Sequence, residues 1–465
     1  MTRTIGHGHH ALSERPLHVL IDAINDNAHV RGPDRYLLGL INGLVALDLQ
    51  DRFTIAHAPW QRAFAGLSLP TNFETLELAP PRQPARRVLW HALRFPREVR
   101  RLAPDVVLLP NIILAPRLGR PSVMTVHDLA HFRYPEKFGP VRGRLQRLLI
   151  RVALASADRL IAVSRFTQSD LEHFTGIGPE RSSVILEGAP DVVATPPTPS
   201  GWPPFFLYVG QIERSKNIEG LIEAFVAGAE LRAKGIELWI AGWPGNAQRS
   251  VKAMIARNPD ARIRLLGYVG EARLAELYAN CLAFTFPSLV EGFGLVLLEA
   301  MAHGAPVLAM RVASIPEVTG DAALLIDPDT PGVLTRGLVR LSTDADLRLQ
   351  LRALGKIRLQ AFSWRDAARD THALCQQAIA AARRDAIELT LAVPTTRSGD
   401  GEIQRRKNRA EVCRRSRLDP QSLQSRPPLQ PPRHLQEETR GRSGGVASNG
   451  GLRSLAPGDA ETRSH

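Results

Sequence analysis

The sequence predicts an α/β protein with two doubly wound parallel-sheet domains. A chain of 465 residues is too long for one hydrophobic core. Along most of it, short apolar runs typical of buried strands alternate with amphipathic helical patterns, which is the order of strands and crossover helices in parallel sheets. Residues 190–204, rich in Pro, Thr and Ser, separate two such series and have the composition of an interdomain linker.

The first domain is expected at residues 17–189, after a flexible N-terminus at residues 1–16. Its first buried strand is predicted at residues 17–22, followed by a polar loop through Asp34 and a helix at residues 36–47. Further strands are predicted, with helices between them, at residues 106–109, 122–126, 159–163 and 183–186.

The second domain is expected at residues 205–363, again with alternating strands and helices, and an amphipathic helix follows at residues 364–385. Residues 386–465 are polar and rich in Arg, Ser, Gln, Pro and Gly, which predicts a disordered basic tail. From Arg397 onward this tail holds 14 Arg and Lys residues against eight Asp and Glu, about half of the net charge of +13. We favour a solvated appendage over a tail that binds nucleic acid or anionic lipid.

The most informative segment, residues 286–302, places two carboxylates, Glu291 and Glu299, eight positions apart. A glycine turn and a helix start separate them: Gly292, Phe293, Gly294 and Leu295. Glycines let the backbone approach a ligand closely, and free N–H groups at a helix start favour phosphate. Two glutamates at this spacing most often lie on a solvated helix face. Here the strand, glycine turn and helix favour a ligand site instead, with Glu299 near ribose hydroxyls and Glu291 near a sugar.

Several other blocks occur in a fixed order around this segment. In the second half they are residues 208–217, 238–242, 266–269, 291–299 and 314–323. In the first half they are residues 104–107, 125–128 and 157–167. Together these blocks resemble the group 1 glycosyltransferases, the retaining family 4, over roughly residues 17–375. The resemblance implies the GT-B fold, with two Rossmann-like domains facing a cleft and the helix at 364–385 crossing back to the first domain.

The resemblance also implies the reaction. The expected enzyme is a hexosyltransferase that moves a sugar, with a weak lean to mannose, from a UDP- or GDP-linked donor to a glycan or lipid-linked saccharide acceptor. Cell-surface polysaccharide, lipopolysaccharide and glycolipid assembly all fit. The nucleotide sugar is a substrate and no cofactor is expected. No Asp-x-Asp of the kind that metal-dependent glycosyltransferases use to hold a divalent ion is evident after a strand. We therefore expect transfer without a metal, because Lys216 and the helix start can neutralise the leaving diphosphate.

The site residues follow from the matched blocks. Donor-binding positions are Gly210, Lys216, Arg214, Tyr268, Val269, Gly292, Phe293, Gly294, Leu295 and Glu299. The implied catalytic residues are His127, Asp128 and Glu291. His127 is expected beside the anomeric carbon through its carbonyl or ring, while Asp128 and Glu291 hold donor hydroxyls. Gln211 stands where many relatives carry an arginine, and Arg214 is an alternative source of that charge.

Two further segments have open interpretations. Residues 31–36 stand where relatives carry a glycine-rich turn near the diphosphate; either acceptor specificity has altered this loop, or it is a helix start capped by Asp34. Ser164 and Thr167 follow a strand, and we favour a helix cap there over contact with acceptor or phosphate.

The expected location is cytoplasmic, because neither a spanning apolar run nor a signal-peptide pattern is evident and the cysteines, Cys281, Cys375 and Cys413, are scattered. Residues 84–101 interleave arginines with Trp and Phe, and residues 142–151 are similarly basic. Such segments are typical of surface helices, and they also fit peripheral contact with an anionic membrane at the inner face of the cytoplasmic membrane. No specific nucleic acid partner is expected.

Two alternatives of other classes stay open. One is a sugar-nucleotide epimerase of the same fold, which would convert the donor without an acceptor. The other is a catalytically decayed binding protein, for which Gln211 and the altered Pro33-Asp34 loop are the only support.

Overall fold

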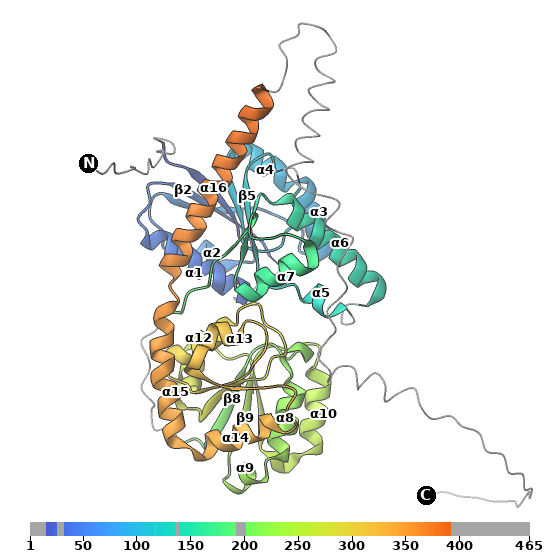
Figure 1. Ribbon diagram of the computed structural model, residues 1–465, viewed down its shortest axis with the longest axis vertical. Helices are drawn as coiled ribbons and strands as arrows, with labels where there is room; N and C mark the ends of the chain where they lie inside the picture. The colour runs from blue at the N-terminus through green and yellow to red at the C-terminus, as the bar shows by residue number, and fades with distance from the viewer. Residues whose placement is uncertain (1–14, 26–31, 117, 136–138, 192–200, 392–465) are drawn as a thin grey trace, which may run out of the picture. The chain divides into compact units, whose positions relative to one another are not determined.

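A computed structural model describes residues 15–25, 32–116, 118–135, 139–191 and 201–391 (Figure 1). These residues form two parallel sheets with helices on both faces, as the alternating pattern predicts. No helix among them is both long and apolar enough to cross a membrane.

The first sheet has the strand order β3-β2-β1-β4-β5-β6-β7, and each neighbouring pair is parallel. Its strands are β1 (His18–Asp22), β2 (Arg52–His57), β3 (Phe73–Glu77), β4 (Val106–Leu109), β5 (Ser122–Val126), β6 (Arg159–Ala162) and β7 (Ser182–Val184). The helices between them are α1 (Gly32–Ala46), α2 (Arg62–Ala65), α3 (Pro84–Leu93), α4 (Phe95–Leu102), α5 (Ala130–Arg133), α6 (Pro140–Ser156) and α7 (Arg165–Thr175). The strand order reverses between β1 and β4, and such switch points are where open α/β sheets bind ligands.

The second sheet has the order β10-β9-β8-β11-β12-β13, also parallel throughout, with its switch point between β8 and β11. Its strands are β8 (Phe205–Val209), β9 (Glu237–Ala241), β10 (Ile263–Gly267), β11 (Ala283–Phe286), β12 (Val307–Met310) and β13 (Ala323–Ile326). Its helices are α8 (Ile218–Ala227), α9 (Ala229–Ala233), α10 (Gln248–Arg257), α11 (Glu271–Asn280), α12 (Leu295–Ala302), α13 (Ile315–Thr319), α14 (Val333–Thr343) and α15 (Ala345–Arg358). Short 3-10 turns lie at Arg214–Lys216, Pro259–Ala261, Gly320–Ala322 and Leu359–Ala361.

The central strands of each sheet are buried on both faces, whereas the edge strands β3 and β10 are partly exposed. Strands β4, β5, β9, β11 and β12 are buried at every position, so most of their residues are apolar and they show no alternation of apolar and exposed polar side chains. Helices α1 and α16 (Trp364–Leu391) cover one face of the first sheet, while α3, α4 and α6 pack on the other face. Figure 1 shows α16 running along α1.

The seam between α1 and α16 depends on glycine. A Cβ at Gly43 would lie 2.2 Å from the Trp364 carbonyl oxygen, and a Cβ at Gly39 would lie 2.2 Å from the Trp364 ring. His372 Nε2 also lies within hydrogen-bond distance, 2.5 Å, of Asp51 Oδ2. The last long helix is therefore held against the first sheet by close backbone approach and by a hydrogen bond.

The structure corrects three expectations. Helix α1 begins at Gly32, not at residue 36, so Asp34 lies inside its first turn and is not the cap. Asp34 is buried there and accepts a 2.6 Å hydrogen bond from Asn25. Strands β2 and β3 were not predicted.

Helix α16 continues to Leu391, because residues 386–391 are mostly good helix formers, whereas the sequence assigned them to the tail. The expected flexible N-terminus up to residue 14, part of the linker, the tail from residue 392, and Cys413 lie outside the described residues.

Candidate active site

A lysine and a glutamate meet at the switch point of the second sheet. Lys216 lies in the loop after β8, and Glu291 follows β11, the neighbouring strand. Lys216 Nζ lies 2.6 Å from Glu291 Oε1, and the side chains are 26% and 12% exposed. Burial lowers the pKa of Lys216, but the charge and hydrogen bond of Glu291 outweigh burial and raise it above the ordinary value. The ammonium therefore stays charged where the sequence predicted a diphosphate.

The glycine turn after Glu291 touches the first sheet. A Cβ on Gly292 would lie only 1.6 Å from the His127 carbonyl oxygen, so no residue larger than glycine fits. Ser164 Oγ donates to the Gly292 carbonyl at 2.6 Å, and Thr167 Oγ1 lies 3.3 Å from the His127 oxygen. Ser164 also caps α7 by accepting from the Thr167 N–H at 3.1 Å, which confirms the predicted cap.

The turn leads directly into α12. Gly294 has φ of 98°, a left-handed conformation that favours glycine, and no side chain among the described residues caps the helix start. Ser314 Oγ lies within hydrogen-bond distance of the carbonyls of Glu291 (2.9 Å) and Phe293 (3.1 Å). The N–H groups at the start of α12 are thus aimed by a turn that is anchored from several elements. The anchoring role of Ser314 was not predicted, although Ser314 is the first residue of the matched block at residues 314–323.

Glu299 lies on α12 and forms an ion pair with Arg35 of α1. Burial lowers the pKa of Arg35, but the charge and hydrogen bond of Glu299 raise it by more. Glu299 was expected near ribose hydroxyls, and Arg35 was considered only as part of the segment at residues 31–36.

His127 is held by protein groups on both ring nitrogens. Nε2 lies 2.9 Å from the Pro110 carbonyl oxygen and Nδ1 lies 3.3 Å from Glu187 Oε1. Burial lowers the pKa of His127, but the hydrogen bond and charge of Glu187 raise it, and the net result is a pKa above the ordinary value of 6.5. With both nitrogens occupied, the carbonyl is the group of His127 that faces the Gly292 turn. Glu187, sixty residues away in sequence, could not be found by motif spacing.

Asp128, the other predicted catalytic residue of this loop, is exposed, and its Oδ1 accepts from the Ala130 N–H at 3.0 Å. The structure therefore brings together Lys216 with Glu291 and His127 with Gly292. Among the described residues the Asp128 side chain makes no hydrogen bond to Lys216 or Glu291, but its charge contributes to raising the pKa of Lys216.

The backbone is tightly packed where β8 and β9 end. Gly210 has φ of 152° and Gly242 has φ of 147°, and a Cβ on Gly242 would lie 1.8 Å from the Gly210 carbonyl oxygen. Side chains are excluded there, so the chain after β8 stays close to the sheet edge.

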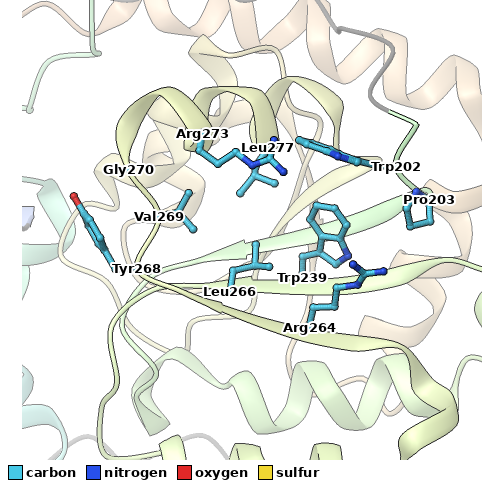
Figure 2. Close-up of a pocket in the computed structure, with 10 residues that line it drawn as sticks. All are labelled: Trp202, Pro203, Trp239, Arg264, Leu266, Tyr268, Val269, Gly270, Arg273 and Leu277. Atoms are coloured by element: carbon cyan, nitrogen blue, oxygen red, sulfur yellow. The ribbon is translucent and has the colours of Figure 1, made fainter.

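A pocket of about 450 Å³ includes two predicted donor-binding positions, Tyr268 and Val269, in its lining. It is lined by Trp202, Pro203, Trp239, Arg264, Leu266, Tyr268, Val269, Gly270, Arg273 and Leu277 (Figure 2). Figure 2 shows Tyr268 and Trp202 at opposite ends. Tyr268 is 56% exposed and its ring stacks on Trp243, with centroids 4.7 Å apart. Lys216 and Glu291 do not line this pocket, so the ion-pair site lies outside it.

Comparisons with known proteins agree with this geometry. The model of "Glycosyl transferases group 1" matches residues 197–358, and that of "Glycosyltransferase Family 4" matches residues 30–190. The O-antigen chain mannosyltransferase B of Escherichia coli is 32% identical over 274 residues, 56% of this chain and 71% of the relative. The chain belongs to the group 1 glycosyltransferases. It is accordingly an enzyme, a hexosyltransferase, as the sequence predicted.

Solved structures show the same fold as this glycosyltransferase. Sucrose-phosphate synthase from Thermosynechococcus elongatus matches with a TM-score of 0.65 at 19% identity, over 78% of this chain and all of that one. Anabaena HepE in complex with UDP-glucose matches with a TM-score of 0.60 at 18% identity, over 76% of this chain and 98% of that one. The GT-B fold predicted from the sequence is confirmed.

The loop after β8 has a neutral amide, Gln211, where many relatives carry an arginine, and Arg214 stays a predicted source of that charge. Gln211 Nε2 lies 3.4 Å from the Pro244 carbonyl oxygen. Arg214 is exposed, and its backbone N–H bonds to Asn246 Oδ1 at 2.9 Å. In the part of the chain that the structure describes, no three His, Cys, Asp or Glu side chains are grouped so as to hold a metal ion. Metal-independent transfer stays a prediction.

Proposed function

We propose that this glycosyltransferase moves a hexose, with mannose favoured, from a nucleoside-diphosphate sugar to a glycan or lipid-linked saccharide. The transfer retains the anomeric configuration and needs no metal. The role belongs to cell-surface polysaccharide or glycolipid assembly. Support for mannose and for the pathway comes from the O-antigen chain mannosyltransferase B and from a serotype-specific mannosyltransferase of Escherichia coli, 27% identical over 293 residues but only 36% of that protein.

The observation that carries the proposal is the Lys216–Glu291 pair beside the Gly292 turn and the α12 start. A departing nucleoside diphosphate gains negative charge, and a fixed ammonium with oriented N–H groups stabilises that charge. The His127 carbonyl, held by Thr167 and packed on Gly292, presents partial negative charge that suits an electron-poor anomeric carbon. Glu291 then serves as an acceptor for donor hydroxyls.

The test is calorimetric binding of UDP-, GDP-, ADP- and dTDP-sugars to the full chain and to Lys216→Ala and Glu299→Ala. We expect one nucleotide class to bind, with both variants losing at least about tenfold in affinity, because each loses a charged hydrogen bond. Lys234→Ala, at an exposed lysine, is the matched control and should bind as wild type does. Failure of every donor to bind would refute the proposal and favour the decayed binding protein.

Turnover separates the remaining alternatives. Proton NMR of the product formed from the donor that binds should show that the anomeric configuration of the donor sugar is preserved. An inverted configuration would refute retention. Conversion of the donor sugar in the absence of any acceptor would instead favour the epimerase. HepE was solved with UDP-glucose, so uridine donors belong in the panel as well as guanosine donors.

We further propose peripheral contact with an anionic membrane through α3 and α6. Both helices pack on the same face of the first sheet, and neither contains an acidic residue. Their outer sides expose large apolar side chains: Val88, Leu89, Leu93, Val141, Leu145, Leu148 and Val152. Arginines of both helices accompany them: Arg86, Arg87, Arg142, Arg144, Arg147 and Arg151. Apolar and basic side chains together favour an anionic bilayer surface over neutral lipid.

Vesicle cosedimentation tests this contact. The protein should sediment with phosphatidylglycerol vesicles more than with phosphatidylcholine vesicles, and the double variant Leu145→Ser, Leu148→Ser should lose that binding. Leu349→Ser, at a 63% exposed leucine of α15, is the control for removing an exposed apolar side chain. Equal sedimentation of all three proteins would contradict the proposal.

A further inference from the structure

Arg35 is a cation of the first sheet's α1 that meets a carboxylate of the second sheet's α12. Its guanidinium Nη1 contacts Glu299 Oε1, and the two side chains are 34% and 13% exposed. Glu299 lies four residues after Leu295, the first residue of α12, which is about 6 Å along a helix that rises 1.5 Å per residue. The Arg35 side chain therefore ends within about one turn of the N–H groups at the α12 start.

The backbone that carries Arg35 is fixed beside the reacting carbonyl. The next residue, Tyr36, is buried, and its hydroxyl lies 3.1 Å from Thr125 Oγ1. The Tyr36 ring packs edge-on against His127, with centroids 4.8 Å apart. Because His127 in turn touches Gly292, the base of the Arg35 side chain is held near the same turn as Lys216 and Glu291.

The charges of the site form two separate neutral pairs. Lys216 is bound to Glu291, and Arg35 is bound to Glu299. Both carboxylates are among the groups proposed above to accept hydroxyl hydrogens from a nucleotide sugar. A ligand that brings both hydroxyls and phosphates can exchange partners in each pair, so that hydroxyls occupy the carboxylates while phosphate oxygens occupy the cations.

We propose that Arg35 is the second diphosphate-binding cation of this enzyme and that the donor releases it from Glu299. This inference rests on the proposed donor site. A guanidinium presents a planar fork that binds two phosphate oxygens at once, which a lysine cannot do. Arg35 then complements Lys216 from the opposite sheet, where Gln211 is neutral and Arg214 is exposed.

A series of ligands with increasing numbers of phosphate groups tests whether Arg35 binds the diphosphate. Binding of a nucleoside, its monophosphate, its diphosphate and the nucleotide sugar is measured by calorimetry for wild type, Lys216→Ala, Arg35→Ala and Arg35→Lys. We expect Arg35→Ala to weaken the diphosphate and the nucleotide sugar about 10- to 100-fold and to leave the nucleoside unchanged. Arg35→Lys should recover part of the loss. Arg52→Ala, which removes an exposed ion pair with Glu74, is the control and should match wild type throughout.

If the donor releases Arg35 from Glu299, removing the Glu299 charge should strengthen binding of a phosphate ligand, whereas removing Arg35 weakens it. Glu299→Gln leaves Arg35 without its carboxylate, so inorganic pyrophosphate should bind this variant several-fold more tightly than wild type, while the nucleoside binds more weakly. If the Arg35–Glu299 pair were only structural, Glu299→Gln would not combine tighter pyrophosphate binding with weaker nucleoside binding.

Several outcomes overturn the inference. If Arg35→Ala binds the diphosphate as wild type does while Lys216→Ala does not, the donor site stands and Arg35 has no part in it. If Arg35→Ala weakens every ligand equally, including the nucleoside, Arg35 only holds the structure together. If wild type binds no ligand of the series, the proposed function and this inference fail together.

Discussion

Replacing Gly292 by alanine tests whether the turn after Glu291 positions the reacting groups. The added Cβ would lie 1.6 Å from the His127 carbonyl oxygen and 2.7 Å from its carbon, whereas ordinary contact begins at 3.4 Å. The turn or the carbonyl must therefore move by about 1.8 Å. A displacement of about 1 Å at a reacting centre costs on the order of 100-fold in rate. We expect Gly292→Ala to lower kcat/KM by at least about 100-fold.

The assay is initial-rate transfer with the donor found by the binding panel, together with thermal unfolding of each variant. Gly66→Ala is the control, because Gly66 has φ of −101° and its nearest neighbour, the Arg62 carbonyl oxygen, would lie 3.7 Å from the new Cβ. Overpacking costs about 1 to 3 kcal/mol, so the Tm of Gly292→Ala should fall modestly while the fold persists. A folded Gly292→Ala enzyme within about threefold of wild-type kcat/KM would refute the positioning argument.

Further predictions concern the cap, the buried histidine, the long helix and metal dependence. Ser164→Ala and Asp344→Ala each remove a helix cap and should each lose about 1 kcal/mol of stability. Only Ser164→Ala should also lower kcat, because Ser164 donates a hydrogen bond to the Gly292 carbonyl and Asp344 lies on the remote helix α15. The pKa of His127 in the folded protein is raised above 6.5, so the stability that its protonation contributes is fully present below pH 6.5 and is lost as the pH rises through the raised pKa. The fall in Tm from pH 6 to pH 8 should therefore be smaller in Glu187→Gln than in wild type. An identical fall in the two proteins would contradict this prediction. Trp364→Ala should cost about 3 kcal/mol in denaturant unfolding, because the ring fills the seam against α1, and a cost below about 1 kcal/mol would contradict that role. Turnover should persist in EDTA, and its abolition with recovery on adding magnesium would refute metal independence.

The fold could be predicted from sequence because most residues of the buried strands are apolar and lie in short runs. The strands at residues 106–109 and 122–126 were predicted with the bounds that the structure gives. Strand β3 was missed because it lies at the edge of its sheet and carries exposed glutamates, so its residues do not form an apolar run. The start of α1 was misplaced because Gly32 and Pro33 are typical of a loop, although proline is well suited to the first turn of a helix.

The candidate site was predictable where its chemistry is local in sequence or where its residues lie in the matched blocks, as Lys216 and His127 do. Glu291, Gly292 and Gly294 are adjacent, so a turn and a helix start could be inferred from their spacing. Glu187 and Arg35 lie 60 and 264 residues from the groups they bind, and no periodicity links such distant positions. Contacts of this kind depend on how two sheets bring their strand ends together, which a pattern along the chain does not encode.

The pairing of each cation with a carboxylate gives the proposed site a selectivity that separate charges would lack. An unpaired, partly buried cation attracts any anion, and cellular phosphate would then compete with the donor. In this enzyme a phosphate alone must break the Lys216–Glu291 or Arg35–Glu299 pair and leave a carboxylate unsatisfied. A nucleotide sugar compensates both carboxylates with its own hydroxyls. The glutamates thus raise the affinity for the complete donor relative to its fragments, and neutralising Glu299 should reduce the preference for nucleotide sugar over pyrophosphate.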